Sequence, residues 1–234
     1  MGKGRIIVTG ASKGIGAAIA TELDRRGFDV VCLSRSGTAP KGHGIVCDMT
    51  DEGAVRAAMS EVAARGPVTG LVNNAGVHIG GAIATLDTRD FERTMALNAT
   101  AIMVAAREIY PHLKDAGGVI VNIGSFFDRM GVPDNLSYCA SKAAVAAMTR
   151  CMAVEWARDK IKVMNVAPGY IETDLNRDFL ARENVRNWLA QRIPTGAPGS
   201  VDDVSHLVAA IFAENIGCLT GETIYIDGAQ GINH

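Results

Sequence analysis

The sequence is short of several features that would mark whole classes of protein. No apolar run reaches the ~20 residues that a membrane-spanning helix needs. The N-terminus leads directly into a strand-like segment, without the charged region and apolar core of a secretory signal. Lys and Arg number 23 against 25 Asp and Glu, so the chain lacks the basic surface that nucleic acids and anionic membranes attract. We therefore expect a cytoplasmic protein that binds neither nucleic acid nor a membrane.

Cysteine and histidine are few and scattered. The five cysteines fit neither a disulfide framework nor the spacing of a zinc site, so we expect reduced thiols. Cys139, beside Tyr138, is interpreted as a small buried apolar residue and not as a nucleophile. The five histidines do not cluster with Asp, so we expect no metal site and reject a metal-dependent hydrolase. The histidines are His43, His78, His112, His206 and His234.

What the chain does have is a regular alternation of short β-branched runs with longer amphipathic segments. Strands are expected over 5–9, 29–33, 43–47, 69–73, 118–124, 160–167 and 223–226. Helices are expected over 14–26, 51–65, 87–114, 137–157, 174–191 and 201–213, with only a loop or a stub of helix over 34–42. Consecutive apolar residues such as Ile6-Ile7-Val8 indicate strands that are buried on both faces. The pattern predicts an α/β fold whose parallel sheet carries helices on both faces.

A glycine-rich turn follows the first expected strand. Gly10, Gly14 and Gly16 are spaced Gly-x-x-x-Gly-x-Gly, which differs from the common Gly-x-Gly-x-x-Gly fingerprint. A tight turn from strand to helix needs glycine where a Cβ would collide with backbone or ligand. Such a turn also directs free amide N–H groups toward a pyrophosphate at the helix N-terminus. Its place after the first strand of an alternating chain predicts nucleotide binding.

Tyr138 and Lys142 are four residues apart in an expected helix, so their side chains share one face. A free tyrosine has a pKa of about 10 and exchanges protons poorly at neutral pH. A positive charge ~4 Å away is worth roughly 4 kcal/mol at an effective dielectric constant of ~20, or about three pKa units before desolvation opposes it. The pair predicts an acid–base tyrosine, although a Tyr and a Lys at this spacing also occur by chance in many helices.

These motifs, taken together and in order, resemble those of the short-chain dehydrogenase/reductase family. The motifs are Gly10-x-x-x-Gly14-x-Gly16, Asn73-Asn74-Ala75-Gly76, Ser125, Tyr138-x-x-x-Lys142, and Pro168-Gly169 with Thr173. The resemblance implies one Rossmann-type domain over residues 1–234, a doubly wound parallel sheet of about seven strands in the order 3-2-1-4-5-6-7, and a substrate lid over about 174–195. The Gly10–Gly14 gap is similar to the single-domain branch and argues against the longer sugar-nucleotide epimerases.

The resemblance also implies a nicotinamide cofactor, which the residues after the second strand identify as NADP more than NAD. NAD-binding members usually carry an acid at that point, whereas this chain has Ser34 followed by Arg35. Arg35 could bind a 2′-phosphate bidentately, and Lys13 in the glycine turn could reach the same group. The alternative is that both are ordinary surface cations.

Other cofactor contacts follow from the same resemblance. Asp48 matches the Asp that contacts the adenine amino group, although it could instead cap the next helix. The remaining expected contacts are Gly10, Ser12, Gly14, Ile15, Gly16, Met49, Asn74, Ala75, Gly76, Tyr138, Lys142, Pro168, Gly169, Ile171 and Thr173.

The family's catalytic residues map onto Asn98, Ser125, Tyr138 and Lys142. Tyr138 would protonate the alkoxide that hydride transfer to a ketone leaves, and Ser125 would hold the carbonyl oxygen. In the family the Asn bends its helix and holds a relay water. Read separately, Ser125 could be a strand-end hydroxyl and Asn98 a helix defect. We predict a ketone–alcohol oxidoreductase; the alternative is a protein that senses NAD(P) without catalysis.

The sequence says less about the substrate and the assembly. The expected substrate contacts are Ser125, Phe126, Phe127, Tyr138 and Tyr170. They suit an apolar, cyclic or aromatic carbonyl compound or alcohol, or a 3-oxoacyl thioester, although Ala197 replaces the family's usual Arg. Leu175, Phe179, Leu180 and Trp188 could line the substrate site or pack the lid helix onto the body. Small residues on the helix from Ser137, the helix ending at Lys114 and the tail 224–230 resemble the surfaces of a homotetramer or homodimer.

Overall fold

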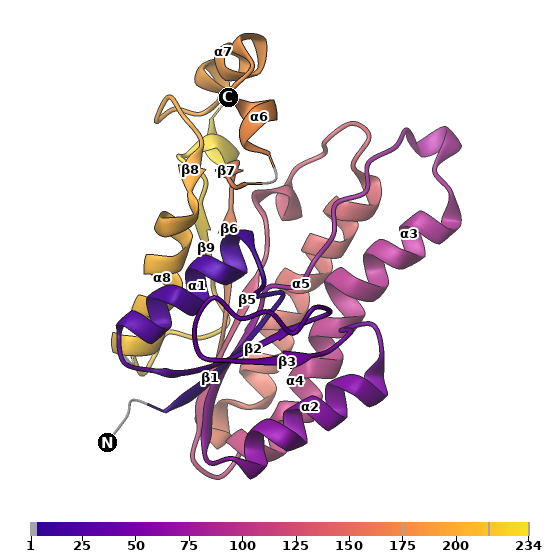
Figure 1. Ribbon diagram of the computed structural model, residues 1–234. Coiled ribbons are helices and arrows are strands. Elements are labelled where there is room, and N and C mark those ends of the chain that lie inside the picture. Colours follow the sequence, from indigo (N-terminus) through magenta and orange to yellow (C-terminus); the bar gives the residue numbers. More distant parts are fainter. Residues whose placement is uncertain (1–3, 175, 215, 234) are drawn as a thin grey trace.

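Seven short, mostly buried strands pair in parallel to form the central sheet (Figure 1). The computed structural model describes residues 4–174, 176–214 and 216–233. The strands are β1 (Arg5–Thr9), β2 (Asp29–Ser34), β3 (His43–Val46), β4 (Val68–Asn73), β5 (Gly118–Ile123), β6 (Ile161–Pro168) and β9 (Thr223–Ile226). Their order is β3-β2-β1-β4-β5-β6-β9, which confirms the order expected from the sequence. Residues 35–42 form no helix, so the expected loop between β2 and β3 is also confirmed.

Helices cover both faces of this sheet because alternate strand residues point to opposite sides. Ile6 and Val8 of β1 pack with helices α1 (Gly14–Arg25) and α8 (Val201–Glu214). Ile7, between them in the sequence, points to the opposite face of the sheet and packs into a second hydrophobic cluster. The helices that cover this face are α2 (Glu52–Ala64), α4 (Ala101–Leu113) and α5 (Leu136–Glu155).

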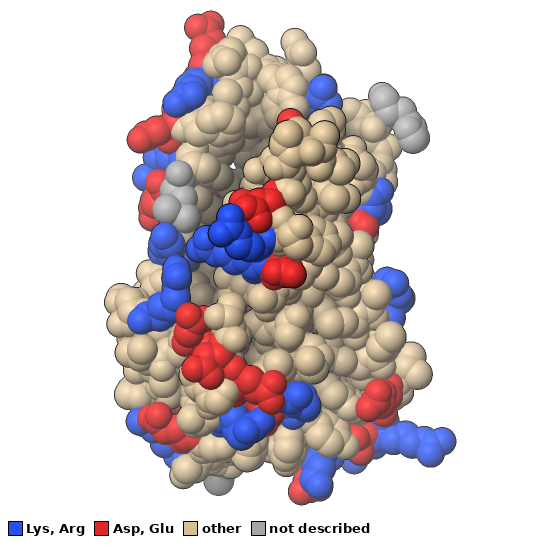
Figure 2. Space-filling view, turned by 90° about the vertical axis from the view of Figure 1, so that its right-hand side faces the viewer, with Lys and Arg blue, Asp and Glu red and all other residues tan. Residues whose placement is uncertain are grey.

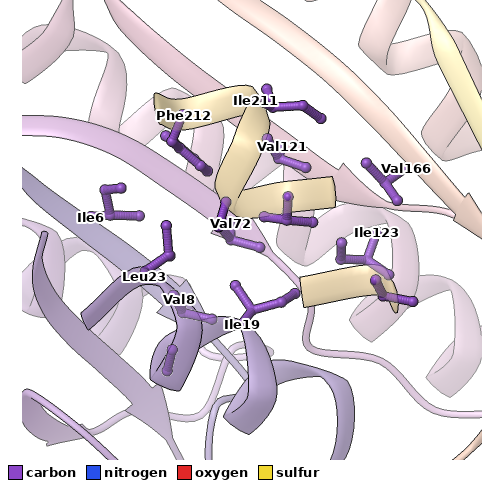
Figure 3. Close-up of a cluster of buried hydrophobic side chains, with 14 of the residues drawn as sticks. Ile6, Val8, Ile19, Leu23, Val72, Val121, Ile123, Val166, Ile211 and Phe212 are labelled. Atoms are coloured by element: carbon purple, nitrogen blue, oxygen red, sulfur yellow. The ribbon is translucent and has the colours of Figure 1, made fainter. Parts of the chain in front are cut away.

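The α1–α8 side of the core is a continuous layer of branched and aromatic side chains (Figure 3). Ile19 and Leu23 of α1 and Phe212 of α8 lie against Val72 of β4. A Cβ on Gly70 would collide with the Phe212 ring, so glycine at this point lets α8 approach the sheet closely. Among the described residues, no helix combines the length and apolar character that crossing a bilayer requires.

The helix expected over 87–114 is interrupted. α3 (Thr88–Met95) passes into a five-residue π-helical turn, η2 (Ala96–Thr100), before α4 begins. Asn98 lies inside this turn and is fully buried. π-Helical turns are frequent at functional sites, and this one marks the position where the sequence predicts a catalytic Asn.

The single helix expected over 174–191 is wrong. The structure has two short helices instead, α6 (Arg177–Leu180) and α7 (Glu183–Arg192), because the backbone of Arg182 is extended. Before and after them, β7 (Ile171–Glu172) and β8 (Gly199–Ser200) form a small parallel sheet. Leu175 lies outside the described residues. In Figure 1 these helices stand beyond the carboxyl ends of β6 and β9.

The short one-turn helices complete the chain. They are η1 (Ile83–Thr85), η3 (Phe126–Arg129), η4 (Ala157–Asp159) and η5 (Gln230–Ile232). The η3 turn directly follows β5 and places the residues after Ser125 at the carboxyl edge of the sheet. In open parallel sheets ligands bind at this edge, where the strand order reverses, which is at β1 and β4 here.

Candidate active site

The turn between β1 and α1 is shaped for an anion. Gly10 has a φ of +65°, and a Cβ there would lie 2.8 Å from Ala75 Cα. A Cβ on Gly16 would collide with Asn74 and with the Gly10 carbonyl, so glycine permits tight packing of α1 on the sheet. Lys13 precedes α1 without a side-chain cap, and the first turn holds no acid. The amides at this helix N-terminus are therefore left for a ligand.

A cavity of about 570 Å³ opens beside this turn, beyond the ends of β1, β2 and β4. Its walls include the predicted cofactor contacts Gly10, Ser12, Lys13, Gly14, Ile15, Gly16, Ser34, Arg35, Asp48, Met49, Asn74, Ala75, Gly76 and Thr173. They do not include Tyr138, Lys142, Pro168, Gly169 or Ile171. The residues that the sequence reasoning missed are Cys47, Thr50, Val77, Arg93 and Leu97.

The charge of this cavity is mainly positive. Among the described residues that line it are Lys13, Arg35 and Arg93, against the one carboxylate of Asp48. Hydrogen bonds from Thr50 N at 2.9 Å and Thr50 Oγ1 at 2.7 Å hold the pKa of Asp48 below its usual value, and Arg35 adds to this. Asp51, not Asp48, caps α2 by accepting from Ala54 N. The capping alternative for Asp48 is therefore wrong, and its carboxylate faces the cavity.

The residues present fit a dinucleotide. The free amides and the cations suit its phosphates, and an ionised carboxylate suits the adenine amino group. Gly76 has no side chain, so the backbone of the cavity wall can pack closely against Asn98 at this point.

Tyr138, Lys142 and Ser125 come together at the carboxyl end of β5. The Lys142 ammonium lies 5.5 Å from the centroid of the Tyr138 ring and donates to the Ile123 carbonyl at 2.8 Å. The hydroxyl of Ser125, which follows β5, shares a hydrogen bond with the Tyr138 phenol. One helical turn of α5 and one strand end thus bring the three predicted side chains into one cluster.

The pKa of Tyr138 corrects the sequence-based expectation. Burial of the phenol raises its pKa above 10, and the hydrogen bond with Ser125 only partly opposes this. Lys142 does not supply the expected lowering because its ammonium points at the Ile123 carbonyl and is itself poorly hydrated. Burial lowers the pKa of Lys142 to about 8, with Asp128 acting in the opposite direction. The protein alone therefore keeps the phenol protonated.

Asn98 fastens the loop after β4 to α5. Its Oδ1 accepts from Val77 N at 2.8 Å, and its Nδ2 donates to Val77 O at 2.8 Å and to Ser141 Oγ at 3.1 Å. Ser141 Oγ in turn donates to the Tyr138 carbonyl at 2.8 Å. Both amide hydrogens are used, so this side chain has none left for a relay water. No motif in the sequence marks Ser141, because its role depends on how α5 meets the π-helical turn.

A row of aromatic rings leads from Tyr138 to the helices α6 and α7. Ring centroids are 5.9 Å apart for Tyr138 and Phe127, 6.4 Å for Phe127 and Tyr170, and 5.8 Å for Tyr170 and Trp188. Phe126 lies against both Phe127 and Tyr170. The predicted substrate contacts are thus neighbours in space.

A second cavity, of about 360 Å³, lies at the far end of this row. Its walls are Tyr170, Phe179, Leu180, Asn184, Val185, Trp188 and Leu189. Leu180 packs with Leu189 and Ile193, as one alternative expected. Phe179 and Trp188 remain 51% and 41% exposed, so they line the cavity more than they fix the helices.

The doubly wound parallel sheet, the glycine turn and the cavity define a Rossmann-type nucleotide-binding enzyme. The sequence profile described as short chain dehydrogenase matches residues 5–184. The chain belongs to this short-chain dehydrogenase/reductase family of oxidoreductases, whose members here act on CH–OH groups.

Relatives match along nearly the whole chain. The 3-oxoacyl-[acyl-carrier-protein] reductase MabA of Mycobacterium tuberculosis is 34% identical over 232 residues, 98% of this chain and 93% of that protein. Gluconate 5-dehydrogenase of Gluconobacter oxydans is 29% identical over 238 residues, 96% of this chain and 93% of that protein. A crystal structure of gluconate 5-dehydrogenase from Burkholderia cenocepacia, in complex with NADP and tartrate, superposes with a TM-score of 0.92 at 29% identity, covering 100% of this chain and 97% of that one.

Because the ammonium of Lys142 is buried, we expect its contribution to the free energy of unfolding to depend on pH. The pKa of Lys142 is about 8 in the folded protein and 10.5 in an exposed lysine, so the unfolded chain binds more protons between these values. Relative to Lys142→Met, the wild type should therefore gain free energy of unfolding, about 3 kcal/mol, as pH rises through that window. Urea denaturation of both proteins at several pH values measures this.

The matched control is Lys41→Met, which removes the same kind of side chain from an exposed position. A Lys142→Met difference that does not change with pH would contradict the burial of a titrating ammonium.

Proposed function

We propose that the protein interconverts a ketone and a secondary alcohol with NADP, using Tyr138 as the group that gives and takes the proton. The observation that carries this proposal is the cluster of Ser125, Tyr138 and Lys142 at the carboxyl end of β5, beside a cavity suited to a dinucleotide. When bound, the nicotinamide supplies hydride to the carbonyl carbon or removes it from the alcohol carbon.

The side chains have separate tasks in this proposal. In reduction the Tyr138 hydroxyl gives its proton to the oxygen that becomes the alcohol, and in oxidation its phenolate takes that proton back. Ser125 donates a hydrogen bond to the same oxygen, where negative charge develops. Lys142, one helical turn from Tyr138, holds its ammonium on the Ile123 carbonyl, where it would meet the cofactor. Asn98 and Ser141 hold α5 in place against the loop after β4 through their hydrogen bonds.

The cofactor would be held by groups spread over several strand ends. The amides of the glycine turn suit the pyrophosphate, and Asp48 suits the adenine amino group. Ser34, Arg35 and Lys13 suit a 2′-phosphate, which the NADP in the related Burkholderia structure also favours. Tyr138 and Lys142 would face the nicotinamide ribose, and Pro168, Gly169, Ile171 and Thr173 the nicotinamide.

A protein that senses NAD(P) without catalysis has no need for Ser125 and Lys142 around Tyr138, so the complete cluster favours catalysis. Among substrates, the aromatic row and the second cavity favour an apolar or aromatic compound. The relative MabA is named for a 3-oxoacyl substrate, and an acyl chain would also suit these walls.

Tyr138→Phe removes one oxygen and leaves the ring contacts in place. We expect it to lose several orders of magnitude in kcat while the Kd for NADP stays within about twofold, because the proton transfer disappears and the cofactor walls do not. Steady-state kinetics and calorimetry measure the two quantities. Residual activity above a few per cent would remove Tyr138 from the proton transfer.

Ser34→Asp combined with Arg35→Ala tests the choice of cofactor. A carboxylate repels a 2′-phosphate and accepts hydrogen bonds from the ribose hydroxyls of NAD, so the ratio of kcat/KM for NADPH over NADH should fall by at least about 100-fold. Arg56→Ala, at a cation of α2 outside the cavity walls, is the control. An unchanged ratio in the double variant would refute the NADP assignment.

We propose in addition that the chain assembles as a homotetramer, or as a homodimer, through α4 and α5. Met103 of α4 and Val154 of α5 are 41% and 81% exposed, and α5 carries several alanines. On the side of the molecule that Figure 2 shows, which is the right-hand side of Figure 1, charged side chains of both signs form separate groups with uncharged surface between them.

Light scattering at micromolar concentration should give a multiple of the 24.6 kDa chain mass, and Met103→Glu should reduce that multiple. Val46→Glu, at an exposed residue of the edge strand β3, should leave it unchanged. A wild-type monomer would rule the assembly out.

A further inference from the structure

The loop after β4 carries an exposed histidine that is held firmly in place. Residues 77–81 meet residues 133–137 through hydrogen bonds at three successive points. His78 Nε2 bonds Asn135 Oδ1, Ser137 Oγ donates to the Ile79 carbonyl at 3.2 Å, and Gly81 N donates to the Asp134 carbonyl at 2.8 Å. An exposed side chain normally keeps its rotamer freedom, so fixing this one costs conformational entropy.

The fixed imidazole lies directly beside the Tyr138 ring. The two ring centroids are 4.7 Å apart with an interplanar angle of 54°. Asp134 supports this arrangement with a φ of +61°, a left-handed conformation that is uncommon outside glycine. Strained backbone of this kind persists where the surrounding contacts enforce it, and it is common at ligand sites.

The hydrogen bonds define which nitrogen of His78 is free. Asn135 Nδ2 donates to the Pro133 carbonyl at 2.7 Å, so its Oδ1 is the atom that faces His78. An amide oxygen only accepts, so Nε2 carries the proton. In the neutral ring Nδ1 is then an acceptor, and within the described part of the chain it has no hydrogen-bond donor. Its lone pair is therefore unused by these residues.

Tyr138 is therefore in contact with two chemically different rings. Phe127, at 5.9 Å, begins the aromatic row that ends at the second cavity. His78 offers a hydrogen-bond acceptor from another loop, and among the described residues no ring contact joins it to Phe127 or Tyr170. A ketone whose oxygen contacts Tyr138 has two substituents on its carbonyl carbon. The Phe127 side suits an apolar substituent, and the His78 side suits a polar one.

We propose that His78 selects substrates that carry a hydroxyl group on the carbon next to the reacting carbonyl, with an apolar or aromatic group on the other side. The substrate class is an α-hydroxy ketone, or the vicinal diol in the reverse direction. The hydroxyl donates to His78 Nδ1 and keeps its proton, while the carbonyl carbon gains hydride and its oxygen gains the Tyr138 proton. This inference rests on the proposed ketone–alcohol reaction and specifies its substrate.

The test compares α-hydroxyacetophenone with acetophenone, which differ by one hydroxyl group. We expect the ratio of their kcat/KM values, measured with NADPH, to fall by about tenfold in His78→Leu, which is the loss of one hydrogen bond. His78→Asn should keep most of the ratio, because its short amide can place an acceptor near the position of Nδ1. His43→Leu, at an exposed histidine of β3, should keep it fully.

Each variant's kcat/KM ratio for the two ketones is compared with the wild-type ratio, so the intrinsic difference in reactivity between the ketones cancels. A His78→Leu variant that keeps the wild-type ratio overturns the inference, even if both ketones are good substrates. Circular dichroism of each variant verifies that the fold is retained.

A binding measurement separates this inference from the reaction itself. Calorimetry of the NADP⁺-loaded protein should show tighter binding of phenylethylene glycol than of α-methylbenzyl alcohol, and His78→Leu should remove that difference. Should neither ketone be turned over, the proposed reaction fails for this substrate class while the calorimetry still tests His78. Equal binding of the two alcohols by wild type would overturn the role of His78.

Discussion

Lys142 brings an ammonium group into a place that water hardly reaches, one helical turn from a buried phenol. Much of the architecture around α5 serves to hold this pair. The end of β5 offers the Ile123 carbonyl to the ammonium, and the next turn of chain offers Ser125 to the phenol. Asn98 and Ser141 lock α5 to the loop after β4. Burial is costly for both groups, because each would ionise more easily in water. A fold accepts such a cost where function requires it.

In the proposed function, the same burial gives the cofactor a part in the ionisation of Tyr138. Without it, burial raises the pKa of Tyr138, and the lysine alone does not reverse this. A ligand that brings positive charge beside the phenol would lower its pKa when oxidation requires a base. In the proposed function, the cavity lined by Lys13, Arg35 and Arg93 would supply the binding energy for the distant, anionic end of that ligand. Cofactor binding and proton transfer would then take place at different strand ends of one sheet.

Much of this could be predicted from the sequence, since strand periodicity, the glycine spacing and the Tyr–Lys interval are local patterns. The family resemblance that these patterns carry implied the order of the seven strands and the cofactor roles of Asp48 and Arg35; the structure has that order, and both residues line the cavity. What could not be predicted depends on tertiary contacts. The extended Arg182 splits the lid helix, and five residues around Asn98 change hydrogen-bond pattern. The burial that raises the pKa of Tyr138, and the direction of the Lys142 ammonium toward a carbonyl of another element, likewise depend on tertiary packing. His78 carries no motif and gains its place only through Asn135.

The central claim is that Tyr138 is a buried phenol whose ionisation the bound oxidised cofactor brings toward neutral pH. An ultraviolet difference titration of phenolate absorbance, wild type minus Tyr138→Phe, measures this group alone among the four tyrosines. The account predicts a midpoint above the ordinary value of about 10 in the free protein and a midpoint lower by at least about two pH units with saturating NADP⁺. The same midpoint in both states would contradict it.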